Sequence, residues 1–168
     1  MNKKEETRKV NEEPASDGIR GFWVEKIREL EEHVFSEPWY KDTTRRTAFL
    51  IGLLAQRVAY KSQEQFSSTK PVKRFHAILK AGSNEDKMLK ILEFCEQELL
   101  KIEGSQKRSS PLFGKKMDSH LRTLIHEHLR KHEEDFTDEG TLIAFFDGYQ
   151  YFLGSASDVD ENNGKNND

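Results

Sequence analysis

The stretch TRRTAFLIGLLAQRVAYKSQ, residues 44–63, decides the fold that we expect of this chain. Its apolar residues point in nearly every direction when they are placed on a helix, which is typical of the central member of a helical bundle. Asp42, Thr43 and Thr44 stand at the start of this run, and their side-chain oxygens can cap its first turn. The sequence therefore predicts one long, buried helix with other helices packed around it.

A helical period also runs through the segments on both sides of this stretch. Before it, an apolar stripe predicts an amphipathic helix that ends before Pro38. After it, Pro71 suits the first turn of a short helix over 71–81, which Gly82 ends. The stripe of the first helix consists of Ile19, Phe22, Trp23, Ile27, Leu30 and Val34.

Three more helices follow a capping box formed by Ser83 and Asp86. The first ends before a loop at 104–114, the second spans about 116–134, and Thr137 or Asp138 caps the last, which runs through 139–154. Their apolar stripes consist of Met88, Ile91, Leu92, Cys95, Leu99 and Ile102, and of Met117, Leu121, Leu124, Ile125 and Leu129. We therefore expect an all-α fold: a single bundle of about six helices over 18–154, with residues 1–17 and the acidic tail 155–168 disordered.

The overall composition indicates a cytoplasmic protein without membrane association. Of the 168 residues, 35% are apolar and 34% are charged, and no stretch approaches the roughly 20 apolar residues that a membrane span needs. The first residues lack the apolar core of a signal peptide. Cys95 is the single cysteine, so no internal disulfide can form.

Positive charge is concentrated in one quarter of the chain. Residues 41–81 contain nine Lys or Arg against two acidic residues, a net charge of +7, whereas the whole chain carries −3. On a helix, Arg46, Arg57 and Lys61 fall within about 60° of one another, so we expect one basic face. Such a face binds the phosphates of a nucleic-acid backbone, or is an ordinary solvated surface. The candidate nucleic-acid-binding residues are Arg45, Arg46, Arg57, Lys61, Lys70, Lys73, Arg74 and Lys80, with Tyr60, Phe66, Phe75 and His76 interleaved as candidates for stacking on bases.

Several histidines lie in the segment of the expected fifth helix. His120, His128 and His132 are spaced for one helix face, which is compatible with a metal site, but the order His-Glu-x-x-His is absent. A polar helix face, or phosphate contacts beside neighbouring Lys and Arg residues, explains them better. The chain also lacks a glycine-rich phosphate loop and a serine nucleophile elbow. Acidic neighbours should also raise the pKa of the Cys95 thiol and lower its reactivity. Taken together, the missing motifs, this thiol and the histidine spacing lead us to expect no enzymatic activity, no cofactor, no metal and no small-molecule substrate.

The last expected helix is rich in aromatic residues. They are suited to the core, although one side of the helix can alternatively remain exposed as a docking surface for a partner. Trp39 and Tyr40, just before the central helix, either serve the same purpose or fix the start of that helix. The aromatic residues are Phe145, Phe146, Tyr149, Tyr151 and Phe152.

Two stretches together resemble a known family: TAFLIGLLAQRVAYKSQEQFSSTKPVKRFHAILKA (47–81) and FFDGYQYFLGSA (145–156). They are similar to the C-terminal helical region of the large subunit of type I-B CRISPR Cascade complexes, a region that is also made as a separate small subunit. The matching features are the apolar run Phe49–Ala55 followed by Val58, a connection bearing Lys and Arg, and a closing Phe-rich helix. The resemblance spans about residues 39–154, and the acidic helix before it has no clear counterpart in the family.

The resemblance implies a non-catalytic small subunit that stabilises the R-loop between guide RNA and target DNA. Such subunits contact strand backbones, while base pairing reads the sequence. The candidate basic residues would then touch target or displaced DNA, and other surfaces would meet neighbouring copies and other Cascade subunits. The alternative is a helical protein–protein adaptor without a nucleic-acid role that uses the surface of residues 145–152. A metal-dependent helical enzyme using the three spaced histidines is the third hypothesis.

Overall fold

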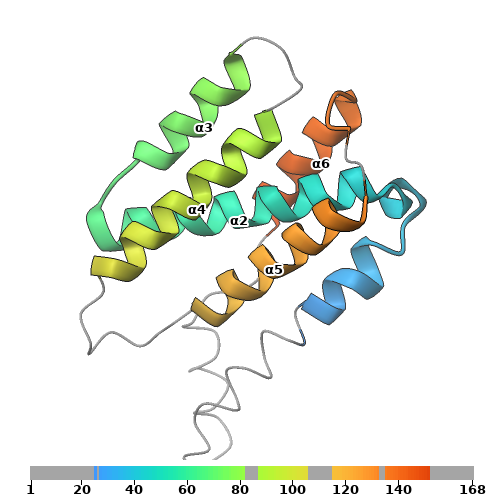
Figure 1. Ribbon diagram of the computed structural model, residues 1–168, viewed down its shortest axis with the longest axis horizontal. Helices are drawn as coiled ribbons and strands as arrows, with labels where there is room; N and C mark the ends of the chain where they lie inside the picture. The colour runs from blue at the N-terminus through green and yellow to red at the C-terminus, as the bar shows by residue number, and fades with distance from the viewer. Residues whose placement is uncertain (1–24, 26, 82–86, 106–114, 133–134, 152–168) are drawn as a thin grey trace, which may run out of the picture.

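The computed structural model describes residues 25, 27–81, 87–105, 115–132 and 135–151. These residues form a bundle of helices without a strand among them, which confirms the predicted all-α class (Figure 1). The terminal segments predicted to be disordered lie outside the described residues. So do Gly82, the capping box of Ser83 and Asp86, and the first apolar residues of the N-terminal helix, Ile19, Phe22 and Trp23.

The central helix α2 (Thr43–Phe66) is the element on which the other helices pack (Figure 1). Asp42 caps it by accepting hydrogen bonds from the backbone amides of Thr44 and Arg45 at 2.9 and 3.4 Å. Every residue from 47 to 55 is buried, as predicted for a helix that is surrounded on all sides. Ser67, in the left-handed conformation with φ 49°, ends the helix.

Helix α6 (Glu139–Gln150) crosses α2 at a point where each helix has a glycine. A Cβ added to Gly52 of α2 would lie 2.9 Å from the carbonyl carbon of Phe145. A Cβ added to Gly148 of α6 would lie 2.7 Å from the carbonyl carbon of Phe49. Side chains do not fit into such spaces, so the two backbones touch and glycine is required on both sides.

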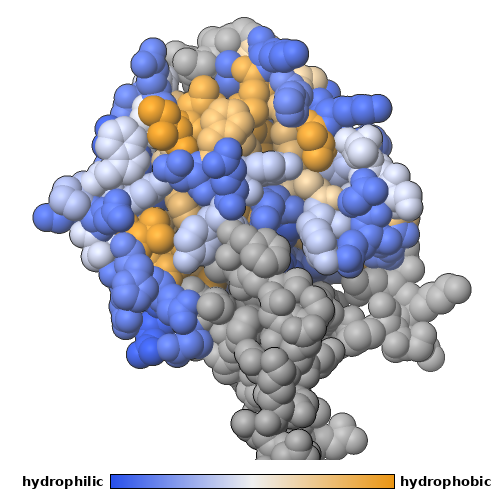
Figure 2. All heavy atoms as spheres, turned by 180° about the vertical axis from the view of Figure 1, so that it is seen from behind, coloured by the Kyte–Doolittle hydropathy of each residue, from blue (hydrophilic) through white to orange (hydrophobic). Residues whose placement is uncertain are grey.

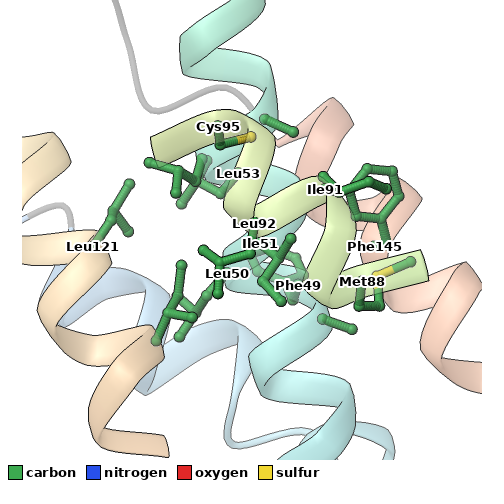
Figure 3. Close-up of a cluster of buried hydrophobic side chains, with 14 of the residues drawn as sticks. Phe49, Leu50, Ile51, Leu53, Met88, Ile91, Leu92, Cys95, Leu121 and Phe145 are labelled. Carbon is green, nitrogen blue, oxygen red and sulfur yellow. The ribbon is translucent and has the colours of Figure 1, made fainter. Parts of the chain in front are cut away.

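The other helices cover the remaining sides of α2. Helices α4 (Lys87–Ser105) and α5 (Lys115–Lys131) pack on it, and α3 (Lys70–Lys80) lies beside α4 (Figure 1). Pro71 stands in the first turn of α3, as predicted. Figure 3 shows the predicted stripes in the core: Met88, Ile91, Leu92 and Cys95 of α4 and Leu121 of α5 lie around Phe49, Leu50, Ile51 and Leu53 of α2 and Phe145 of α6.

The chain before α2 is less regular than predicted. A helical turn at 27–29 continues into a π-helix, Leu30–Val34, and a short 3-10 helix, Pro38–Lys41, leads to α2. The predicted end before Pro38 is confirmed. Ile27 and Leu30 are buried, as the apolar stripe predicted.

Helix α6 is shorter than predicted at its C-terminal end. Its N-cap is Asp138, which accepts a hydrogen bond from the amide of Gly140 at 3.2 Å. The helix ends at Gln150 and not at residue 154, because Tyr151 has an extended backbone (φ −71°, ψ 115°). The ring of Tyr151 packs edge-on against Phe49, with 5.6 Å between the centroids.

Candidate nucleic-acid interface

Two of the predicted basic residues are part of a buried junction between α2 and α5. Asp118 of α5 is 1% exposed, and its carboxylate accepts hydrogen bonds from Nε of Arg57, at 2.5 Å, and from the ammonium group of Lys61. The prediction that Arg57 and Lys61 share a solvent-facing basic face with Arg46 is therefore wrong. Since α2 is enclosed by other helices, this side of it meets α5 and not solvent.

Two further predicted residues, Arg45 and Arg46, fix the start of α2. Arg46 donates from Nη2 to the backbone oxygen of Phe35 at 3.2 Å and from Nε to the backbone oxygen of Tyr40. The guanidinium carbon of Arg45 lies 3.8 Å from the centroid of the Trp39 ring. Arg45 also donates from Nη2 to Asp138, the N-cap of α6, at 3.1 Å. Both arginines thus hold neighbouring segments in place and are half-buried.

Tyr40 takes the second of the two roles considered for Trp39 and Tyr40, whereas the Trp39 side chain is 37% exposed. The hydroxyl of the buried Tyr40 donates to Oδ2 of Asp147 in α6 at 2.8 Å, and its ring packs against Phe35 and Phe49. Burial, followed by this hydrogen bond, raises the pKa of Tyr40 above its ordinary value. Tyr40 therefore fixes the start of the central helix to α6.

The other four predicted basic residues form an exposed group on α3. We name this group the α3 basic face; its members are Lys70, Lys73, Arg74 and Lys80. The helix turns its other side, with Pro71, Phe75 and Ile78, into the core. No acidic residue lies between Lys70 and Ala81, and in the described part of the chain no ion pair neutralises any of the four cations.

The position of these charges is unfavourable for the stability of α3. Lys70, Lys73 and Arg74 lie in the first turn and a half, at the positive end of the helix dipole. The first turn contains no acidic residue, and the N-cap Thr69 makes no side-chain cap hydrogen bond. Cations here lower the stability of the helix unless an anion binds to them. An anion bound at this end of α3 would therefore stabilise the helix.

Three of the four interleaved aromatic residues are exposed, and they are close in sequence to the α3 basic face. Tyr60 and Phe66 are each 48% exposed, and His76 on α3 is also exposed. Phe75 is instead buried, with its ring packed edge-on against Phe94 and Tyr149 at 5.7 and 6.3 Å. Phe66 ends α2 four residues before Lys70, so an exposed ring and a cation flank the turn between α2 and α3.

The histidines of α5 take part in contacts between side chains. The rings of His128 and His132 are 6.4 Å apart and edge to face, and Nε2 of His126 lies 2.6 Å from a carboxylate oxygen of Glu96 in α4. Among the residues that the structure describes, no three His, Cys, Asp or Glu side chains are grouped as ligands of one metal ion. The Cys95 thiol is buried in the core. Burial, with smaller contributions from Glu96 and Glu98, raises its pKa.

Within the described helices, none is both long enough and apolar enough to cross a membrane. Comparison with known proteins gives no relative, because no family model, curated protein or solved structure matches this chain. Its function is therefore inferred from the geometry of its own surfaces.

Proposed function

We propose that this protein is a non-catalytic nucleic-acid-binding subunit that contacts phosphate backbones through the α3 basic face. The observation that supports this proposal is a group of four exposed cations on α3, a helix that contains no Asp or Glu. A backbone contact of this kind needs charge and not base-specific geometry, and it releases condensed counterions. The exposed rings of Tyr60 and Phe66 add surfaces on which unpaired bases can stack, which favours single strands.

The resemblance of residues 39–154 supports a more specific proposal. In this proposal the chain is a small subunit of a type I CRISPR Cascade complex, with other Cascade subunits, guide RNA and target or displaced DNA as partners. Base pairing would select the target, and the α3 basic face would hold a strand of the R-loop by its phosphates. The protein would then act in the cytoplasm, where such complexes meet invading DNA.

The test is fluorescence anisotropy with a labelled single strand and a duplex of mixed sequence over a series of salt concentrations. With three to four phosphate contacts, the slope of log K against log salt should be about −2 to −4. The charge-reversal variant Lys73→Glu/Arg74→Glu should abolish binding, because it inverts the centre of the α3 basic face. Arg57 and Lys61 are unsuitable for this test, because replacing either disturbs the ion pairs with Asp118.

The matched control is Arg130→Glu/Lys131→Glu, which changes the net charge equally on exposed residues of α5, away from α3 (Figure 1). It should bind within about twofold of the wild type at moderate salt, because screening limits long-range charge effects. Equal losses in the two variants would show that only the overall charge matters. If the protein binds neither the single strand nor the duplex at low salt, the proposal is contradicted.

A second function, that of a protein–protein adaptor, is favoured by a different observation. Leu142, Ile143 and Phe146 on the outer side of α6 are 39%, 53% and 43% exposed. This surface shares no residue with the α3 basic face, so the two functions can be tested separately and can both belong to one subunit.

A further inference from the structure

The outer side of α6 presents an apolar surface, which we name the α6 apolar face: Leu142, Ile143 and Phe146. On a helix these three residues fall within about 100° of one another. The opposite side of α6, with Ala144, Phe145 and Gly148, is buried on α2. Figure 2, the view from behind Figure 1, shows hydrophobic side chains gathered among hydrophilic ones.

The α6 apolar face differs from the scattered apolar residues of an ordinary surface. Leu100 on α4, for example, is 62% exposed, and its neighbours Gln97 and Lys101 are polar and also exposed. On α6, by contrast, the aromatic side chain of Phe146 neighbours two aliphatic side chains, Ile143 at i−3 and Leu142 at i−4. Contiguous apolar surface of this kind is the usual centre of a protein–protein contact.

The charged side chains of α6 itself are all negative. Glu139 lies three residues before Leu142 and four before Ile143, and Asp147 lies four after Ile143, so a carboxylate borders the face on each side along the helix. Helix α6 contains neither Lys nor Arg, and the sequence has none between Lys131 and Lys165. The negative charge of these carboxylates repels nucleic acid and anionic lipid, and it attracts a cationic partner.

We propose that the α6 apolar face binds a basic amphipathic helix of another protein. The apolar stripe of that helix would cover the three exposed side chains, and its flanking Lys or Arg residues would face Glu139 and Asp147. A second copy of this chain offers no such helix among its described residues. The basic amphipathic helix α3 has its apolar side chains, Phe75 and Ile78, already buried.

The proposal is tested with two labelled model peptides and the full-length protein. Both are 18-residue amphipathic helices with the same leucine stripe; one has a polar face of Lys, the other of Glu. The Lys peptide should bind with a dissociation constant on the order of 10 μM and at least tenfold more tightly than the Glu peptide, since three side chains form a small contact. Equal binding of the two peptides, or binding of neither at about 100 μM, would overturn the proposal.

Three variants locate the contact. Ile143→Ser/Phe146→Ser should weaken binding of the Lys peptide at least tenfold, and Glu139→Lys should remove most of the preference between the two peptides, because one carboxylate and one ammonium group then border the face. Leu100→Ser, at a more exposed apolar position on α4, is the matched control and should bind as the wild type does. Circular dichroism checks that each variant is folded. Sedimentation analysis of the wild type completes the test: a dimer that the double variant abolishes would assign the face to a second copy and overturn the proposed partner.

Discussion

Gly148 of α6 lies directly against the backbone of Phe49 in α2, so no side chain separates the two helices at their crossing. Gly52 repeats the arrangement from the other helix, against the backbone of Phe145. The close approach lets the rings of Phe49 and Phe145 enter the core, where they are 2% and 1% exposed. Since α6 also carries the proposed partner surface, this crossing fixes the position of that surface on the bundle.

We expect Gly148→Ala to lower the free energy of unfolding by about 3 kcal/mol or more, because the added methyl group meets backbone atoms that cannot move aside. Urea denaturation followed by circular dichroism measures this difference. Gly104→Ala is the control: a Cβ there meets nothing within 4 Å, and alanine favours a helix by up to about 1 kcal/mol over glycine. A similar effect of both substitutions would contradict the assigned role of the crossing.

The second prediction concerns Asp118, the carboxylate shared by Arg57 and Lys61. Asp118→Asn keeps the shape of the side chain but removes the carboxylate that Arg57 and Lys61 share at this buried junction. We expect a loss of stability of about 3–5 kcal/mol, as is typical when one partner of a buried ion pair is removed. Glu96→Gln, which affects the less buried contacts to Arg122 and His126, should cost about 1 kcal/mol or less.

A triple variant separates charge from shape at the same junction. Replacing the three charged residues together, as Arg57→Met, Lys61→Met and Asp118→Leu, should recover most of the stability that Asp118→Asn loses, because no unpaired charge then remains buried. If the triple variant is less stable than Asp118→Asn, the hydrogen-bond geometry and not the charge is what holds α5 on α2.

The sequence predicted those features that depend on neighbours within one helix. Asp42 and Asp138 cap their helices as expected, and the apolar stripe of α4 is buried, because capping and periodicity act over a few residues. Which apolar side chains of the aromatic-rich helix α6 face solvent depends instead on contacts with another helix. Phe145 is buried and Phe146 is exposed, and only the crossing with α2 decides between them.

The basic site was predicted only in part, because contacts between helices decide which of its cations face solvent. The periodicity of α2 placed Arg57 and Lys61 on one face, but it contains no information about Asp118, which lies 61 and 57 residues further along the chain. The α3 basic face was accessible to sequence reasoning, because its helix is short and amphipathic. The roles of Gly52 and Gly148 become apparent only when the two helices are seen together.

The third prediction concerns alkaline pH and Tyr40. The pKa of Tyr40 is raised from 10.0 by burial and by the hydrogen bond to Asp147, so the folded protein keeps the phenol proton where the unfolded chain releases it. The resulting stability is present below the unfolded pKa and is lost progressively as the pH rises above it. The melting temperature should therefore fall progressively as the pH rises above about 10.

Tyr40→Phe separates this contribution from other effects of alkaline pH. At neutral pH the variant should lose about 1 kcal/mol, the usual contribution of one hydrogen bond. Above about pH 10 its melting temperature should fall less steeply than that of the wild type, because one titrating group is gone. Parallel curves for the two proteins would show that Tyr40 does not titrate differently in the folded and unfolded states. Tyr149, whose pKa burial also raises, should account for part of the remaining slope.

The last prediction uses Cys95 as a reporter of opening of the core. The side chain is 0% exposed and burial raises the pKa of its thiol, so a reagent that needs the thiolate should reach it only after the core opens. We expect labelling at neutral pH to be on the order of 10³-fold slower in the folded protein than in urea. A thiol moved to the exposed position 119, as Cys95→Ala/Ser119→Cys, should react at the unfolded rate and thereby control for reagent quality.

Since Gly148→Ala destabilises the crossing beside this core, it should speed labelling of Cys95 in proportion to its loss of stability. A labelling rate of Cys95 that Gly148→Ala leaves unchanged would instead mean that α4 opens independently of the α2–α6 crossing.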